Sequence, residues 1–146
     1  MFNIEWKETE KMWKETQKCF SMIGGIEEII ELQRELFGGN SSDVCFGDAT
    51  IDGLAYSPDH QKLTVYICYY TDQSFRSENI TAVHYAIDFF EPDIFCFDIE
   101  FNTHWIDDVY IQKNADGKYS ITFGSGELDF RYKCAKVNRC WIDRKK

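Results

Sequence analysis

The chain has 146 residues, the size of one ordinary domain, and 44% of them are apolar, which is enough to build a substantial core. This composition excludes intrinsic disorder. The net charge of −9 argues against a general nucleic-acid binder, because such proteins need clustered Lys and Arg. No uncharged run exceeds nine residues, far short of the length needed to cross a bilayer.

The cysteines and the start of the chain favour a cytoplasmic location. The six cysteines are scattered, at Cys19, Cys45, Cys68, Cys96, Cys134 and Cys140. A chain of this size can fold without disulfides, so we expect these thiols to be reduced. The first residues also lack the basic and then apolar pattern of a secretory signal.

The N-terminal segment, residues 1–38, has the pattern of two helices. Apolar or small residues recur every three or four positions from Trp6 to Ile23, and Lys and Glu occupy the opposite side. Gly24-Gly25 interrupts this pattern, and a second helix is predicted over 26–37. Gly38-Gly39 provides the left-handed stop that commonly ends a helix.

From residue 48 to about residue 137 the apolar period changes from 3.6 to 2, which is typical of strands. The clearest alternating runs cover 63–70, 83–89, 95–101, 119–123 and 128–134. Short turn signals separate them, so neighbouring strands must be antiparallel. We therefore predict a single α+β domain spanning 1–146, with two N-terminal helices packed on an antiparallel β-meander of about seven strands.

Charge is divided unevenly along the chain. Residues 48–108 carry a net charge of −10 and residues 109–146 a net charge of +5, and no Lys or Arg lies between Arg76 and Lys113. This division predicts an acidic docking surface for a basic partner. Its charged residues would be Asp88, Glu91, Asp93, Asp98, Glu100, Asp107 and Asp108, with His104 and Trp105 as contact anchors. The alternative is that the C-terminal bases fold back and neutralise these carboxylates.

The sequence contains no metal or cofactor motif. The three histidines are dispersed, at His60, His84 and His104, and no zinc-binding spacing such as CxxC or HExxH is present. Carboxylates with the spacing of a calcium-binding EF-hand are also missing. We therefore expect neither a metal ion nor a cofactor.

Three weaker hypotheses concern other polar residues. Asp98 and Glu100 could in principle perform acid–base chemistry on a glycoside. Cys134 and Cys140 lie in a basic segment, a setting that can lower the pKa of a thiol, although packed or exposed thiols are the simpler interpretation. The basic segment 133–146 is interpreted as a solvated terminus or an intramolecular counter-charge.

The segment Phe46-Gly-Asp-Ala-Thr-Ile-Asp-Gly-Leu-Ala-Tyr, followed by the strand at 63–70, is similar to a "Phe-x-Asp-x-x-Ile" entry into a β-meander. Trp105-Ile-Asp-Asp-Val-Tyr-Ile fits the same layout. In these features the chain resembles immunity proteins of bacterial polymorphic-toxin and contact-dependent growth inhibition systems.

The resemblance implies a binding protein rather than an enzyme. It would bind and neutralise a cognate toxin domain, commonly a cationic nuclease, and would act as a monomer or weak dimer without nucleic acid or membrane. The alternative is a small enzyme or ligand-binding α+β domain that uses carboxylates in a pocket of the sheet.

Overall fold

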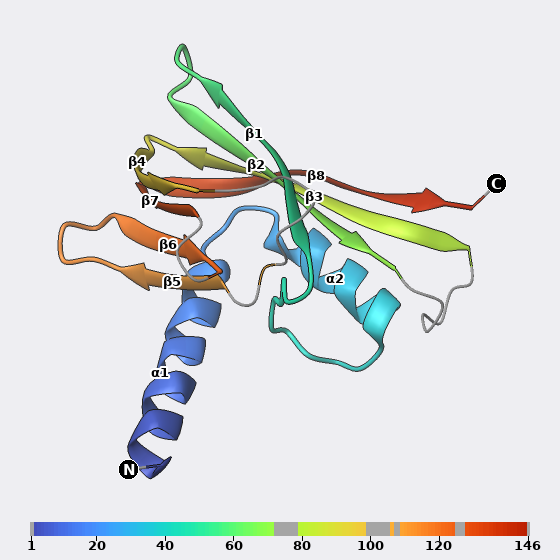
Figure 1. Cartoon of the computed structure of the whole chain (residues 1–146), viewed down its shortest axis with the longest axis horizontal. Helices are drawn as coiled ribbons and strands as arrows, with labels where there is room; N and C mark the ends of the chain where they lie inside the picture. The colour runs from blue at the N-terminus through green and yellow to red at the C-terminus, as the bar shows by residue number, and fades with distance from the viewer. Residues whose placement is uncertain (1, 72–78, 99–105, 107–108, 125–127, 146) are drawn as a thin grey trace.

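The computed structural model describes residues 2–71, 79–98, 106, 109–124 and 128–145. In these residues two helices are followed by eight strands, which form two four-stranded antiparallel sheets (Figure 1). The predicted α+β class, with two N-terminal helices and antiparallel strands, is confirmed.

The helices are α1 (Phe2–Phe20) and α2 (Ile26–Phe37). Gly25 immediately precedes α2 and has a φ of 76°, a left-handed conformation that suits glycine. At the other end Gly38 has a φ of 78°, and its N–H donates to the Arg34 carbonyl at 2.8 Å. The predicted break and the predicted bounds of the second helix are therefore confirmed.

The first sheet has the order β1-β2-β3-β8, and the second sheet has the order β4-β7-β6-β5. The strands of the first sheet are β1 (Thr50–Ser57), β2 (Lys62–Tyr70), β3 (Ile80–Phe90) and β8 (Cys134–Arg144). Those of the second sheet are β4 (Asp93–Phe97), β5 (Val109–Lys113), β6 (Tyr119–Phe123) and β7 (Leu128–Tyr132).

The strands differ from one continuous meander in two places: β4 pairs with β7 rather than with β3, and the C-terminal strand returns to the first sheet. The run that starts at Leu128 divides at Lys133, where the chain leaves the second sheet and returns to the first. Lys133 marks this crossing, since its N–H donates to the Phe90 carbonyl at 2.9 Å. The segment expected to end near residue 137 continues as β8 to Arg144, so most of the basic C-terminal segment is a strand rather than a solvated tail.

The core lies between the two sheets and the helices. Phe89 of β3 contacts Phe130 and Tyr132 of β7, each with ring centroids 4.9 Å apart, and these contacts join the sheets. α1 packs on β5 and α2 packs on β8. The helices were predicted to cover the apolar face of one sheet; α2 covers one face of the first sheet, whereas α1 lies against the second sheet. Among the described residues, no helix combines the length and the apolar character that crossing a membrane requires.

Hydrogen bonds to the backbone attach the helical segment to both sheets. The Thr16 hydroxyl donates to the Ile111 carbonyl at 3.4 Å and accepts from its N–H at 3.1 Å, which fixes α1 on β5. Gly24, between the helices, donates to the Ala135 carbonyl at 3.0 Å and accepts from the Val137 N–H at 2.7 Å. This pairing protects part of the exposed edge of β8.

Asp88 was predicted to lie on an open polar surface, but the structure buries it, with the residue only 1% exposed. Alternation along β3 correctly sets Asp88 on the face opposite Phe89. However, β3 is an inner strand, and its neighbours cover this position. The Asp88 carboxylate accepts from the Thr64 hydroxyl at 2.6 Å and from the Asn138 amide at 3.1 Å, and Lys62 lies 3.9 Å away.

We expect Asp88→Ala to lower the free energy of unfolding by about 1–3 kcal/mol, because the Thr64 hydroxyl and the Asn138 amide lose their acceptor. Urea unfolding followed by circular dichroism measures the loss. Asp93→Ala is the matched control, since Asp93 is exposed and its loss should cost much less. Equal losses for the two variants would contradict this account of Asp88.

Candidate functional site

The acidic surface predicted from β3 and β4 is largely neutralised where the structure describes it. Glu91 lies 3.3 Å from the Lys133 ammonium, and Asp93 lies 3.3 Å from the Lys118 ammonium. Both lysines come from the basic C-terminal third of the chain. At these two positions the alternative of folded-back bases is therefore confirmed.

The remaining predicted residues do not restore one continuous acidic field. Asp88 is buried in the first sheet, whereas Asp98 is exposed just after β4 of the second sheet. Outside the described residues lie Glu100, His104, Trp105, Asp107 and Asp108. Of the described members of the predicted set, Asp98 is exposed and forms no ion pair, and further carboxylates of this kind lie outside that set.

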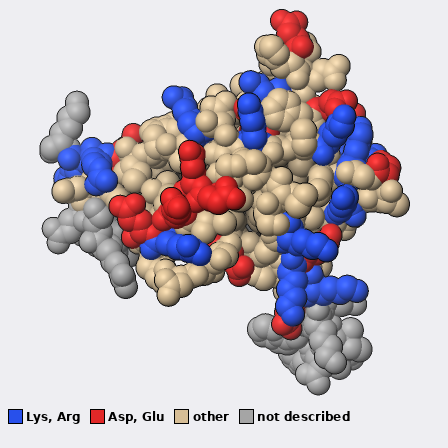
Figure 2. All heavy atoms as spheres, turned by 180° about the vertical axis from the view of Figure 1, so that it is seen from behind, with Lys and Arg blue, Asp and Glu red and all other residues tan. Residues whose placement is uncertain are grey.

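Four such carboxylates project from α2, and we call them the α2 acidic face. They are exposed and comprise Glu27, Glu28, Glu31 and Glu35. Figure 2 shows acidic side chains gathered in a band over this part of the molecule. Within the described part of the chain, none of the four forms an ion pair.

The one basic side chain of α2 is directed elsewhere. The Arg34 guanidinium donates to the Ser41 carbonyl at 2.9 Å and to the Ser42 hydroxyl at 3.1 Å, so it stabilises the loop that follows the helix. Two exposed apolar side chains lie near the ends of α2: Met22 before the helix, which is 65% exposed, and Phe37 at its last position, which is 50% exposed and packs on the Tyr69 ring.

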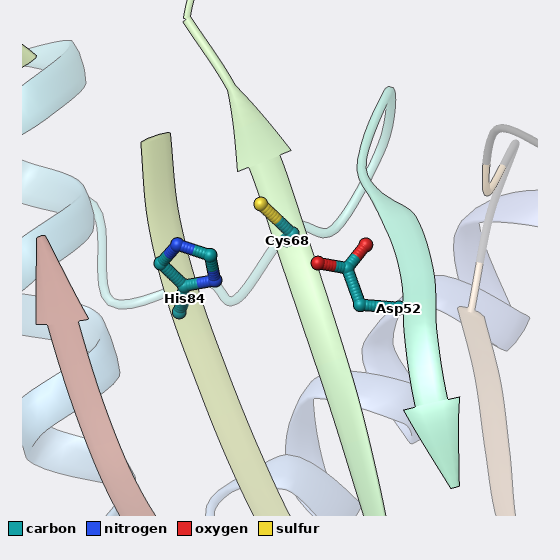
Figure 3. Close-up of side chains that lie close together, drawn as sticks. All are labelled: Asp52, Cys68 and His84. Atoms are coloured by element: carbon teal, nitrogen blue, oxygen red, sulfur yellow. The ribbon is translucent and has the colours of Figure 1, made fainter. Parts of the chain in front are cut away.

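A second polar group lies on the face of the first sheet that the helices leave open. It consists of Asp52, Cys68 and His84, which come from the adjacent strands β1, β2 and β3, and we call it the Asp–Cys–His cluster (Figure 3). One carboxylate oxygen, the thiol sulfur and one imidazole nitrogen lie within 4.8 Å of one another. Cys68 and His84 are directly opposite each other in the β2–β3 register.

A β-bulge in β1 adds the third member. Ile51 pairs with Ile67 and Gly53 pairs with Tyr66, so Asp52 is an extra residue without a partner on β2. Bulges of this kind redirect a side chain. The Asp52 carboxylate is then held from both sides, by the Thr50 hydroxyl at 3.1 Å and the Tyr70 hydroxyl at 3.4 Å.

β8 holds the imidazole of His84 in place. The Nε2 atom of His84 lies 2.7 Å from an Asp143 carboxylate oxygen. The ring is stacked on the Trp141 indole, with centroids 4.6 Å apart and planes 7° apart, and the Arg139 guanidinium lies 4.3 Å from the indole centroid. Because Nε2 is engaged by Asp143, Nδ1 is the nitrogen that faces the other two members (Figure 3).

The thiol of Cys68 is protonated at neutral pH. Burial, with the nearby Asp52 charge as the second cause, raises the pKa of Cys68 to about 12. The cluster by itself is therefore not an activated nucleophile, which requires a lowered thiol pKa. Burial likewise raises the pKa of Cys140 to about 11, so the basic C-terminal segment does not activate that thiol.

Sequence reasoning identified neither group. The α2 glutamates have the spacing of an ordinary solvated helix face, and their one signal is that Glu27, Glu31 and Glu35 follow one another at i,i+4 with no Lys between them on that face. Cys68 and His84 both fall on the polar phase of their strands. Their direct opposition depends on the register, which alternation does not give.

Comparison with protein-family models, with curated proteins and with solved structures gives no match to this chain. The α2 acidic face and the Asp–Cys–His cluster are therefore the features of the chain that bear on its function.

All six cysteines are free, and we expect a thiol-reactive disulfide reagent at pH 8 to separate them by exposure. Cys45 and Cys134 are exposed and should be modified first. Cys68 and Cys19 should resist, because both are buried and burial raises the pKa of each. Peptide mapping by mass spectrometry over time measures the order, with a denatured sample as the control. Labelling of Cys68 as fast as Cys45 would contradict the structure at the cluster.

Proposed function

We propose that this protein is a cytoplasmic inhibitor of a basic protein domain, of the kind that immunity proteins provide against toxins, and that the α2 acidic face is its docking surface. The observation that carries the proposal is the set of four exposed glutamates on one helix without an ion pair among the described residues. Concentrated like charge costs some folding stability, so a complementary partner is its simplest use.

The rigidity of α2 supports this use. Ile26, Ile29 and Leu36 bury the opposite side of the helix, so the glutamates project from a fixed scaffold. A preorganised surface loses little conformational freedom on binding, and its charge accelerates the encounter with a basic partner.

The flanking apolar side chains supply the other requirement of an interface. Charges steer the encounter, but affinity resides mainly in a few buried, well-packed side chains. Met22 and Phe37 are exposed near the two ends of α2, and Phe37 keeps an edge contact with the Tyr69 ring. They take the anchoring role in this proposal.

The alternative of a small enzyme draws its support from the Asp–Cys–His cluster. Its protonated thiol argues against nucleophilic catalysis by Cys68 alone. We therefore place binding, rather than catalysis, as the main function.

The test begins with a pull-down from the source cell at low and moderate salt, with mass spectrometry of the bound proteins. A basic toxin-like domain retained near stoichiometrically is then purified, and its association rate and its inhibition by this protein are measured.

We expect Glu27→Lys/Glu31→Lys to slow association by about tenfold or more at low ionic strength, with the difference shrinking as salt is added. Asp59→Lys/Asp93→Lys is the matched control, because it changes the net charge equally at exposed positions off α2. A second variant reverses the charges of the acidic surface predicted from the sequence, and its association rate is compared with that of the α2 variant. It replaces Asp98, Glu100, Asp107 and Asp108 with Lys. The proposal fails if no basic partner is retained, if the partner keeps its activity when bound, or if the α2 variant associates as fast as the control.

A further inference from the structure

The Asp–Cys–His cluster has a feature that the proposed function does not use: three different metal-donor atoms from three adjacent strands converge on one point of the open sheet face (Figure 3). Together with Asp143, the cluster places two carboxylates, a thiol and an imidazole in one part of the sheet. Such a concentration of anionic and neutral donor atoms favours the binding of a cation.

We propose that Asp52, Cys68 and His84 form a binding site for a transition-metal ion, best suited to zinc. Sulfur, imidazole nitrogen and carboxylate oxygen are the donors that zinc accepts in proteins, whereas magnesium and calcium require oxygen donors alone. The proposal is independent of the α2 acidic face, which lies on the other side of the first sheet.

The orientation of His84 is the second observation that points to a metal ion. A histidine ligand commonly binds through one ring nitrogen while the other is hydrogen-bonded to a carboxylate, which fixes the ring. Here Nε2 is held by Asp143 at 2.7 Å and Nδ1 faces the cluster. The stacking of the ring on Trp141 adds a further constraint on its plane.

Asp52 is held in the same manner. Thr50 and Tyr70 donate to its two carboxylate oxygens, so the group is oriented before any ion arrives. The bulge inserts Asp52 between the pairs Ile51–Ile67 and Gly53–Tyr66, and the β1–β2 ladder continues on either side of it. The two hydrogen bonds and the β-bulge both hold the Asp52 carboxylate toward the cluster, as a preorganised metal ligand requires.

The present spacing is close to that of a bound ion. A tetrahedral zinc, with bonds of about 2.0–2.3 Å, keeps its ligand atoms about 3.3–3.8 Å apart. The three atoms here lie within 4.8 Å of one another, so shifts of about an ångström or less bring them to that spacing. The cluster provides three ligands, so water or a partner's side chain would occupy the fourth position of a tetrahedral ion. Binding would also release the proton of the Cys68 thiol, since zinc takes the thiolate.

Cobalt(II) is the optical probe for this site, because it adopts the same tetrahedral geometry and shows a charge-transfer absorption when it is bound by a thiolate. The full chain is titrated with cobalt under reducing, metal-free conditions and then challenged with zinc. We expect one equivalent to bind with the thiolate band, and zinc to remove that band.

Variants then assign the ligands. Cys68→Ser should abolish the thiolate band, and Asp52→Asn and His84→Gln should each weaken cobalt binding by at least about tenfold. Asp143→Asn acts only through His84, so it should weaken binding by about 10–100-fold and leave the band in place. The double variant Cys45→Ser/Cys134→Ser is the control, because it removes the exposed thiols that could bind cobalt adventitiously.

Circular dichroism and thermal melting establish that each variant is folded. Asp52 and His84 are partly exposed, so their variants test the site even if Cys68→Ser destabilises the protein. The proposal is overturned if the wild-type chain gives no thiolate band, if the band survives in folded Cys68→Ser, if Asp52→Asn and His84→Gln bind as tightly as wild type, or if the control loses the band.

Discussion

The pairing of β8 with β3 is the interaction on which the rest of the structure depends. Both strands have 11 residues, and their pairing returns the chain from the second sheet to the first. On one side of β8, Ala135 and Val137 receive the backbone of Gly24 and fix the start of α2. On the other side, Trp141 and Asp143 hold the imidazole of His84. β8 thus contacts both candidate sites, through its backbone near the start of α2 and through two side chains at His84.

The same strand order explains where negative charge remains uncompensated. The C-terminal third of the chain carries most of the excess base, and folding brings Lys118 and Lys133 to Asp93 and Glu91. The segment with the most acidic sequence is therefore partly neutralised, whereas α2, with a much weaker signal in the sequence, retains its charge. The sequence gives the number of charged residues in each segment. The charge that stays unpaired at the surface depends on which basic side chains fold back onto the carboxylates, and that is a property of the tertiary structure.

The predictable parts of the fold are those that local patterns determine. The bounds of α2 follow from an amphipathic stripe closed by glycines, and β2 and β6 follow from period-two alternation. The extension of β8 beyond residue 137 was not predictable, because the charged residues of this segment interrupt the apolar alternation by which a strand is recognised. Asp88 shows a different limit. Alternation assigns a side chain to a face, but whether that face is covered depends on the neighbouring strands.

The two sites also depend on the sequence in different ways. Charge on the α2 acidic face acts across several ångströms of solvent, so it tolerates shifts of an ångström and depends on ionic strength. The Asp–Cys–His cluster requires its donor atoms to lie within a few ångströms of one another. It exists only because the β2–β3 register places Cys68 opposite His84 and because the bulge after Ile51 adds Asp52. A one-residue slip of β1 would turn Asp52 away and leave α2 unchanged. Register, rather than composition, is therefore the property of this chain that holds the cluster together, which is why motif spacing could not reveal it.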